Sequence, residues 1–258
     1  MKPYFFVLGA PDHEMQEIER VCKERGINHG YATVNCGNIV HTHEAYRATS
    51  VQRLVPPGSH VVMVECSVMG LPAHDVVDHH QPGDPGYGMP PERFFEGSSL
   101  GQFLTMLGLE PTQRQRVIAA ADHCLTAAYK GLCPGVTPDE LRAFREETRS
   151  RARNVSREEL ARQIEEAIKA LKCAPRIRLA DTDVAWFEEM DTAPAEVSEA
   201  SARMGMPYVY LSRQDDGRVK AGIRSAPADV VRIWLDQCGL SSTYGDPQRG
   251  FAGGYFAF

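Results

Sequence analysis

Three short apolar segments in the first third of the chain are each followed by acidic or histidine residues. The segments are residues 4–10, 60–64 and 75–77. The polar residues that follow them are Asp12, Glu65 and the triplet Asp78, His79 and His80. Segments of this length are typical of buried strands, and the carboxyl ends of parallel strands share one edge of a sheet. The pattern therefore predicts an α/β fold with a parallel sheet and a polar site at that edge.

The segments between these strands fit the same fold. An amphipathic helix that ends at Gly26 follows the first strand, and its apolar face carries Met15, Ile18 and Cys22. Residues 81–91 contain four prolines and three glycines and are predicted to form a loop. The remaining elements predicted here are a strand at 30–34 and helices at 44–55, 100–108 (opened by a capping box at Ser99) and 112–129.

The second half of the chain changes character twice. Residues 138–171 are rich in charge and carry apolar residues at helical spacing, which predicts a helical connector. From residue 176 onward, strand-like and helix-like segments alternate again. The predicted strands are 177–179, 184–186, 208–211 and 219–223, the helices 195–204 and 228–238, and a glycine-rich tail covers 244–255. We therefore expect a parallel-sheet N-terminal domain at 1–135, a helical connector at 136–175 and a smaller α/β C-terminal domain at 176–258.

Composition excludes several classes of function. The 258 residues carry a net charge of −6, which argues against a general electrostatic grip on nucleic acid or on an anionic membrane. No apolar run approaches the roughly 20 residues of a membrane-spanning helix, and the first strand is too short for a signal peptide. Seven cysteines without a C-x-x-C pair indicate a reduced, cytoplasmic protein. All nine histidines lie between residues 13 and 123, so we expect the chemistry in the N-terminal half.

Residues 76–82, with the triplet Asp78-His79-His80, resemble the signature of the DHH phosphoesterase superfamily, in which a strand ends in Asp-His-His. Other segments follow the family's order. They are Asp12-His13-Glu14 after the first strand, Glu65 before the triplet, Gly97-Ser98-Ser99 after it, and Asp122 on a helix. The strand that ends in Arg224-Ser225 and the glycine-rich tail resemble the family's DHHA1-type accessory domain.

This resemblance implies a metal-dependent phosphoesterase that hydrolyses a phosphodiester or pyrophosphate bond in a small nucleotide-type substrate or a short oligonucleotide. It implies two Mn²⁺ ions, or another divalent cation, held by Asp12, Glu14, Glu65, Asp78, His79 and Asp122. In the alternative role that the resemblance allows, Asp78 orients His79 and is not itself a ligand. The catalytic residues that it implies are His80 and His123. The substrate-binding residues that it implies are His13 (a ligand in place of Glu14 in one variant), Arg224, Arg249, Gly250, Gly253 and Gly254.

Three departures from the family pattern leave other functions open. Glu14 and Glu65 stand where the family usually has aspartates, and Gly253-Gly254-Tyr255 lacks the family's histidine. The two alternatives are a metal-dependent hydrolase of a non-phosphate bond and a non-catalytic nucleotide-binding protein of the same fold. The sequence also leaves open whether the chain assembles as a homodimer. Asp12 is also well suited to cap the helix that follows it, which would explain an acid there without any ligand role.

Overall fold

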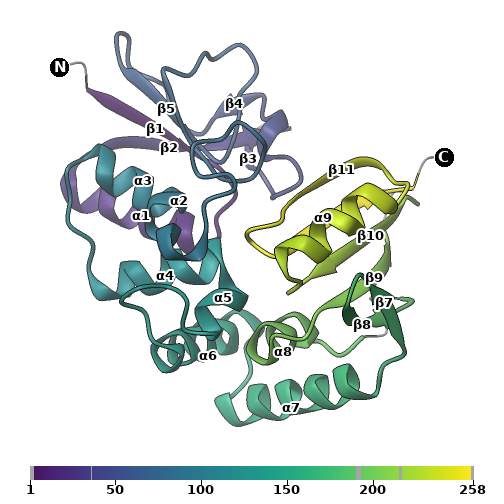
Figure 1. The fold of residues 1–258 in the computed structure, drawn as a ribbon. Helices are drawn as coiled ribbons and strands as arrows, with labels where there is room; N and C mark the ends of the chain where they lie inside the picture. Colours follow the sequence, from purple (N-terminus) through teal and green to yellow (C-terminus); the bar gives the residue numbers. More distant parts are fainter. Residues whose placement is uncertain (1–2, 36, 190–192, 215–216, 257–258) are drawn as a thin grey trace. The chain divides into compact units, whose positions relative to one another are not determined.

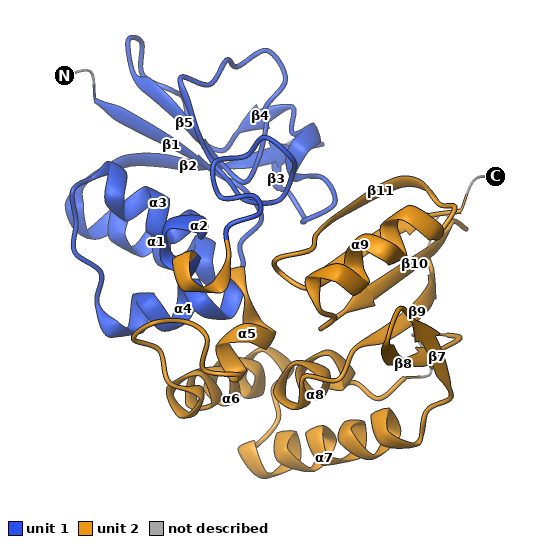
Figure 2. Ribbon diagram, viewed as in Figure 1, with its two compact units in different colours: residues 1–89, 94–122 blue, residues 90–93, 123–258 orange. Residues whose placement is uncertain are grey.

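The computed structural model describes residues 3–35, 37–189, 193–214 and 217–256 (Figure 1). The chain divides into two compact units (Figure 2). Unit 1 comprises residues 1–89 and 94–122, and unit 2 comprises residues 90–93 and 123–258. Each unit carries one six-stranded sheet with helices beside it, which confirms the predicted α/β class. The division at residues 135 and 175 stays a prediction.

The strands of unit 1 are β1 (Tyr4–Leu8), β2 (Asn28–Val34), β3 (Asn38–Ile39), β4 (Ser50–Val51), β5 (His60–Val64) and β6 (Asp75–Val77). The helices of this part are α1 (His13–Arg25), α2 (Phe94–Gly97), α3 (Ser99–Met106) and α4 (Gln113–His123). Short 3-10 turns lie at η1 (Ala45–Arg47) and, within unit 2, at η2 (Pro91–Arg93).

The sheet of unit 1 is mostly parallel. Its strands follow the order β3-β2-β1-β5-β6, and β4 pairs with β2 outside this path. The pairs β1–β2, β1–β5 and β5–β6 are parallel, whereas β3 and β4 run antiparallel to β2. The carboxyl ends of β1, β5 and β6 therefore lie at one edge, as predicted from the sequence.

The two faces of this sheet bury alternate residues of the same strands. Phe5 and Val7 of β1 lie in a core cluster with Val61 and Met63 of β5. Phe6 faces the other way, and its ring centre lies 4.8 Å from that of Phe103 in α3. Because successive side chains of a strand point to opposite faces, a run of apolar residues predicts a strand that is covered on both sides.

The predicted helix at 44–55 is wrong. This segment contains the turn η1 and strand β4, which pairs with β2 through Ser50 and Val51. The hydroxyl of Ser50 also lies 2.7 Å from that of Thr33 on β2. Pairing with an existing strand satisfies the backbone here, so the segment extends the sheet.

The helices of unit 2 are α5 (Leu125–Tyr129), α6 (Pro138–Arg153), α7 (Arg157–Cys173), α8 (Val197–Met204) and α9 (Ala228–Gln237). Its strands are β7 (Arg176–Leu179), β8 (Thr182–Phe187), β9 (Tyr208–Arg213), β10 (Val219–Arg224), β11 (Ser241–Asp246) and β12 (Phe251–Tyr255). They form a sheet of order β11-β12-β10-β9-β8-β7, in which only β8 and β9 pair in parallel among the described residues.

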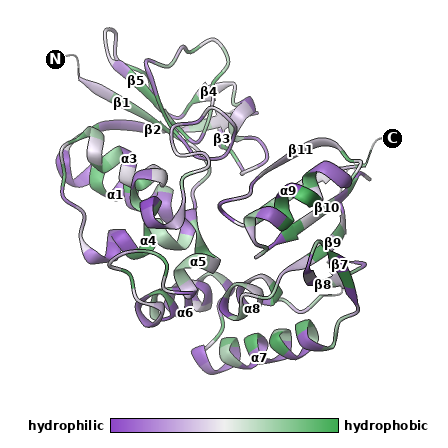
Figure 3. Ribbon diagram, in the orientation of Figure 1, coloured by the Kyte–Doolittle hydropathy of each residue, from purple (hydrophilic) through white to green (hydrophobic). Residues whose placement is uncertain are grey.

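The segment that the sequence predicts to be helical, residues 138–171, forms two helices, α6 and α7. Asn154 ends α6 in the left-handed conformation, and the Ser156 hydroxyl accepts the Glu159 amide to begin α7. Hydrophobic and hydrophilic residues alternate along α7 in Figure 3, and its buried face carries Leu160, Ile164 and Leu171. An amphipathic helix of this kind packs against the unit through one face.

Three other predictions differ from the structure. The helix predicted at 112–129 breaks at Cys124 into α4 and α5, and the glycine-rich tail forms strands β11 and β12. The predicted cap of α3 is shifted by one residue, since Ser98 and not Ser99 accepts the amide of Gly101.

Within the described residues, every helix is too short or too polar to pass through a bilayer.

Candidate metal centre

Four side chains of unit 1 converge although they are far apart in the sequence. They are Glu14, Glu65, His79 and Asp122. Each offers one oxygen or nitrogen atom, and these four atoms all lie within 4.8 Å of one another. All four are among the metal ligands that the family resemblance implies. We call them the four-residue group.

Each member of the four-residue group stands near the end of a different element. Glu14 lies in the first turn of α1, and Asp122 lies in the last turn of α4. Glu65 directly follows β5, and His79 lies two residues beyond β6. Because β5 and β6 are neighbouring parallel strands, their carboxyl ends bring Glu65 and His79 together.

His79 is the central member of the four-residue group. Its Nε2 atom lies 3.2 Å from Oδ2 of Asp122 and 3.4 Å from Oε1 of Glu65. Glu65, His79 and His80 also form a group whose ligand atoms meet the same distance limit. Glu14, Glu65 and His79 are buried, while Asp122 is partly exposed.

Backbone geometry fixes the position of Glu65. Its φ angle is 50°, in the left-handed region that costs energy for a residue with a side chain. Gly9, just beyond β1, donates its amide to the carbonyl of Val64 at 2.9 Å. A Cβ atom on Gly9 would lie 2.5 Å from the carbonyl oxygen of Glu65 and 3.0 Å from that of Val64. Gly9 therefore lets β1 approach the turn that carries Glu65.

Replacing Gly9 with alanine is expected to lower the free energy of unfolding by about 1–3 kcal/mol, because the added methyl overlaps rigid backbone atoms. Urea unfolding checks this, with Gly37→Ala as a control because no atom lies within 4 Å of a Cβ there, although its φ of 102° adds local strain. A Gly9→Ala protein as stable as the wild type would contradict the close approach.

Asp78 has a different position from the four-residue group. Its Oδ1 accepts the backbone amides of His79 at 2.7 Å and His80 at 3.1 Å, and lies 2.9 Å from Nδ1 of His80. Its Oδ2 accepts the hydroxyl of Tyr46 at 2.9 Å. Burial acts to raise the pKa of Asp78, but the hydrogen bonds of His80 and Tyr46 outweigh it and lower that pKa. Asp78 is therefore an ionised anchor that orients His80.

Three residues that were not predicted from the sequence hold this triplet. Tyr46 lies in the segment wrongly predicted as a helix. Gln102 of α3 donates to the carbonyls of Asp78 at 3.0 Å and Gly97 at 2.9 Å, and its Oε1 accepts the amide of Asp78 at 3.3 Å. Asp84 accepts the amide of His80 at 3.0 Å. A lone glutamine on a helix or an aspartate in a loop gives no signal of such a role in one sequence.

The carboxylates of the four-residue group repel one another. Burial, followed by the charges of Asp122 and Glu65, raises the pKa of Glu14 well above its usual value. Burial is also the main cause that raises the pKa of Glu65; the charge of His80 opposes it and that of Asp122 adds to it. Both carboxyls therefore bind a proton more tightly than they would in water, as expected where anionic groups gather without a compensating charge.

The donor set fits a divalent cation. Among the described residues, Oε2 of Glu14 and Oε1 of Glu65 are buried and make no hydrogen bond. Buried carboxylate oxygens are costly unless they are paired with donors, cations or metal ions. A set of three carboxylates and one imidazole suits Mn²⁺ or a similar ion better than a thiolate-binding ion. A cation at this place would offset the repulsion that raises the two pKa values.

Two of the implied residues at the start of α1 lie outside the four-residue group. Asp12 caps the helix, since its Oδ1 accepts the Met15 amide at 2.8 Å. Loss of surrounding water and the charges of Asp122 and Glu65 still raise its pKa, so Asp12 belongs to the same field of negative charge. His13 is the first residue of α1 and is partly exposed. Their ligand and substrate roles stay predictions.

The implied residues of unit 2 make contacts within that unit. His123 is buried, and its carbonyl accepts Nε of Arg249 at 2.9 Å. The guanidinium of Arg224 at the end of β10 lies 5.9 Å from the ring centre of Tyr210. The substrate-binding and catalytic roles of these residues stay predictions.

The three glycines implied as substrate-binding residues have structural reasons of their own. Gly250 has a φ of 76°, and a Cβ atom there would lie 2.9 Å from the carbonyl of Ala226. A Cβ atom on Gly253 would overlap the ring of Tyr244, and one on Gly254 would lie 3.0 Å from the side chain of Leu240. Packing inside unit 2 therefore accounts for these glycines, whatever else they do.

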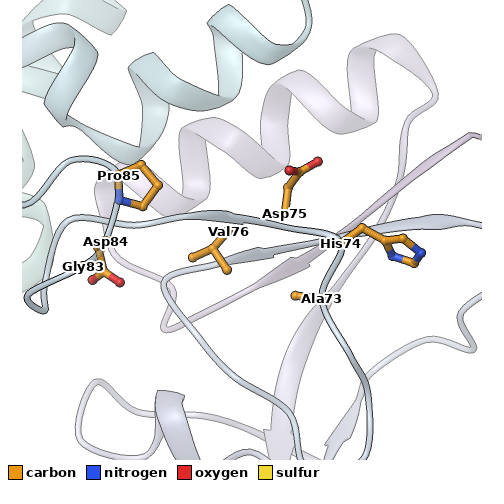
Figure 4. A pocket seen from close by; sticks show the side chains of 7 residues that line it. All are labelled: Ala73, His74, Asp75, Val76, Gly83, Asp84 and Pro85. Carbon is orange, nitrogen blue, oxygen red and sulfur yellow. The ribbon is translucent and has the colours of Figure 1, made fainter.

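A surface hollow of about 370 Å³ lies beside the loop that follows the triplet (Figure 4). The residues that line it are Ala73, His74, Asp75, Val76, Gly83, Asp84 and Pro85. None of them belongs to the four-residue group or to the residues implied by the family resemblance. Asp84 lines the hollow and also contacts the triplet, because its carboxylate accepts the amide of His80.

Comparisons with known proteins found a solved structure that is weakly similar to this chain. No protein-family model matches the sequence, and no curated protein matches it. Among solved structures, the chain is similar to a pGpG-specific phosphodiesterase, PggH from Vibrio cholerae, with 11% sequence identity and a TM-score of 0.42. The match covers 100% of this chain and 94% of that one. The function of the chain therefore has to be inferred from its own residues.

Proposed function

We propose that the chain is a metal-dependent phosphoesterase of the DHH type, which hydrolyses a phosphodiester or pyrophosphate bond in a small nucleotide-type substrate. The observation that carries the proposal is the convergence of Glu14, Glu65, His79 and Asp122. These residues come from four separate segments and match the order of the family's motifs. The net charge of −6 favours a small substrate over long nucleic acid.

Glu14, Glu65, His79 and Asp122 would hold the divalent ions. When bound, such ions neutralise the charge that develops on phosphoryl oxygens and activate water for attack. Asp122 is the partly exposed member of the group. The longer side chains of Glu14 and Glu65 would adjust the spacing of the site.

His80 is the residue best placed to move a proton. The lowered pKa of Asp78 keeps that carboxylate ionised, so Nδ1 of His80 is the donor in their 2.9 Å contact. Nε2 of His80 is then the atom that would pass a proton to the leaving oxygen of the substrate. Asp78 and Tyr46 act through His80 and are positioning residues.

Replacing Tyr46 with phenylalanine is expected to lower turnover by about 10- to 100-fold, the usual cost of losing a hydrogen bond that orients a metal-site residue. The Tyr46 hydroxyl donates to Asp78, so its loss raises the pKa of Asp78 and shifts the acidic limb of the pH–rate profile upward. A variant with reduced turnover and an unshifted profile would show that Tyr46 has only a packing role.

Metal analysis of the purified protein, followed by hydrolysis assays, tests the proposal. We expect bound or tightly binding Mn²⁺ and cleavage of bis-para-nitrophenyl phosphate or of a member of a nucleotide panel. Metal binding without cleavage of any phosphoester would point to a hydrolase of a non-phosphate bond. A protein with no affinity for divalent metal would be the non-catalytic alternative, and either result would overturn the proposal.

A further inference from the structure

Two cysteines of unit 2 lie in near contact. The Sγ atoms of Cys124 and Cys133 are 3.1 Å apart, and neither residue is in a disulfide. Each residue is only 2% exposed. The two thiols therefore face each other inside the protein, within the distance at which one can donate a hydrogen bond to the other.

Local folding holds the two thiols together. Cys124 is the residue at which α4 ends and α5 begins. After α5 the chain turns back at Gly131, whose φ is 72°, and the amide of Leu132 donates to the carbonyl of Ala127 at 3.0 Å. The break at Cys124 and this turn return Cys133 to the beginning of the short helix.

We propose that Cys124 and Cys133 form an oxidation site, at which a peroxide converts the two thiols into one intramolecular disulfide. One thiol sulfur attacks a peroxide oxygen, which gives a sulfenic acid and releases one water when the oxidant is hydrogen peroxide. The second thiol then attacks the sulfenic sulfur, forms the S–S bond and releases a second water. Two thiols are oxidised by two electrons, and one hydrogen peroxide is reduced to two waters.

The geometry favours the disulfide over other products. Reacting atoms held about 3–3.5 Å apart are close to the attack distance, and an S–S bond of about 2.05 Å requires the sulfurs to approach by about 1 Å. A sulfenic acid on either cysteine would meet the other thiol before a second peroxide. Burial keeps bulky disulfides such as glutathione disulfide out and leaves small peroxides as the oxidant class.

The other described cysteines differ from this pair and serve as internal references. Cys173 is exposed, and no thiol contact accompanies it among the described residues. Cys22 and Cys66 are buried like the pair. The thiol of Cys66 donates to the carbonyl of Val7 at 3.4 Å and not to a second thiol. Peroxide is therefore expected to give a linked product at the Cys124–Cys133 pair and only unlinked products at Cys173.

Peptide mapping of the full chain tests the proposal. Trypsin cuts after Arg116, Lys130 and Arg142, which places Cys124 and Cys133 in separate peptides, 117–130 and 131–142. The reduced protein is treated with hydrogen peroxide, quenched with catalase, alkylated in urea and digested. We expect a linked species two hydrogens lighter than the two peptides together, which disappears on reduction.

Two comparisons make the test decisive. Cys133→Ser should lose the linked peptide while the oxidation of Cys173 stays unchanged. Protein unfolded in urea before the peroxide step should give at least several-fold less linked peptide than native protein. Recovery of both peptides in alkylated form, while Cys173 is oxidised, would overturn the proposal. Equal yields from native and unfolded protein would also overturn it, since nearness in sequence rather than the fold would then cause the linkage.

Discussion

Replacing His79 with alanine is expected to abolish tight binding of divalent metal and to lower phosphoester turnover by about a thousand-fold or more. Metal ions stabilise the transition state of phosphoester hydrolysis by several kcal/mol, and each 1.36 kcal/mol of that stabilisation changes the rate tenfold. His79 contacts both Asp122 and Glu65, so its loss removes the nitrogen donor at the centre of the four-residue group. Calorimetric titration with Mn²⁺ and a steady-state assay measure the two effects.

The matched control is His43→Ala. His43 is exposed and its ring stacks on that of His41, with the ring centres 6.1 Å apart. Its replacement removes a histidine from the same half of the chain without touching the four-residue group, and both metal affinity and turnover should stay at wild-type values. Wild-type metal affinity in His79→Ala, with an intact fold by circular dichroism, would contradict the assignment of the centre.

Two of the four residues of the centre were predictable because they follow strands. Glu65 and His79 stand after β5 and β6, and the rule that carboxyl ends of parallel strands share an edge is sufficient to place them together. The depth of burial of Glu14 was not predictable, because Leu100 of α3, distant in sequence, donates the amide that holds it at 3.0 Å. Asp12, equally acidic, is used as a helix cap.

Two of the errors in secondary structure have a common cause, which is long-range pairing of strands. Ala45, Ala48 and Val51 are spaced like one face of a helix, but Val51 lies in β4 and pairs with Ala32 of β2. Glycines are poor strand formers, yet Gly253 lies in β12 opposite Gly222 of β10. No glycine or proline marks the break between α4 and α5, so one sequence gave no reason to expect it.

Replacing Glu14 with glutamine is expected to stabilise the metal-free protein at alkaline pH while it weakens metal binding. Glu14 is 1% exposed, and its pKa is raised by burial and by the charges of Asp122 and Glu65. Glutamine keeps the oxygen that accepts the Leu100 amide and removes the charge. Glu110→Gln is the matched control, because Glu110 is exposed and outside the centre.

The expected pH dependence follows from the direction of this shift. In the unfolded chain Glu14 loses its proton near 4.5, whereas in the folded, metal-free protein it keeps the proton to higher pH. Between these two values the folded state binds more protons, so raising the pH favours unfolding. The loss of stability is absent when the pH is below the pKa of Glu14 in the unfolded chain, and it is complete above the pKa in the folded protein. Glutamine therefore relieves this loss only at high pH.

Urea unfolding of wild type and Glu14→Gln in EDTA, at pH 4 and pH 8, measures this difference. At pH 8 the variant should gain about 1–3 kcal/mol, the usual cost of a buried polar group without partners, and at pH 4 the two proteins should be equally stable. With Mn²⁺ in place of EDTA the order should reverse, because the wild type gains more from binding the ion. A variant that is less stable than wild type in EDTA at pH 8 would show that Glu14 carries no repulsive charge, and the case for a cation beside it would lose its electrostatic basis.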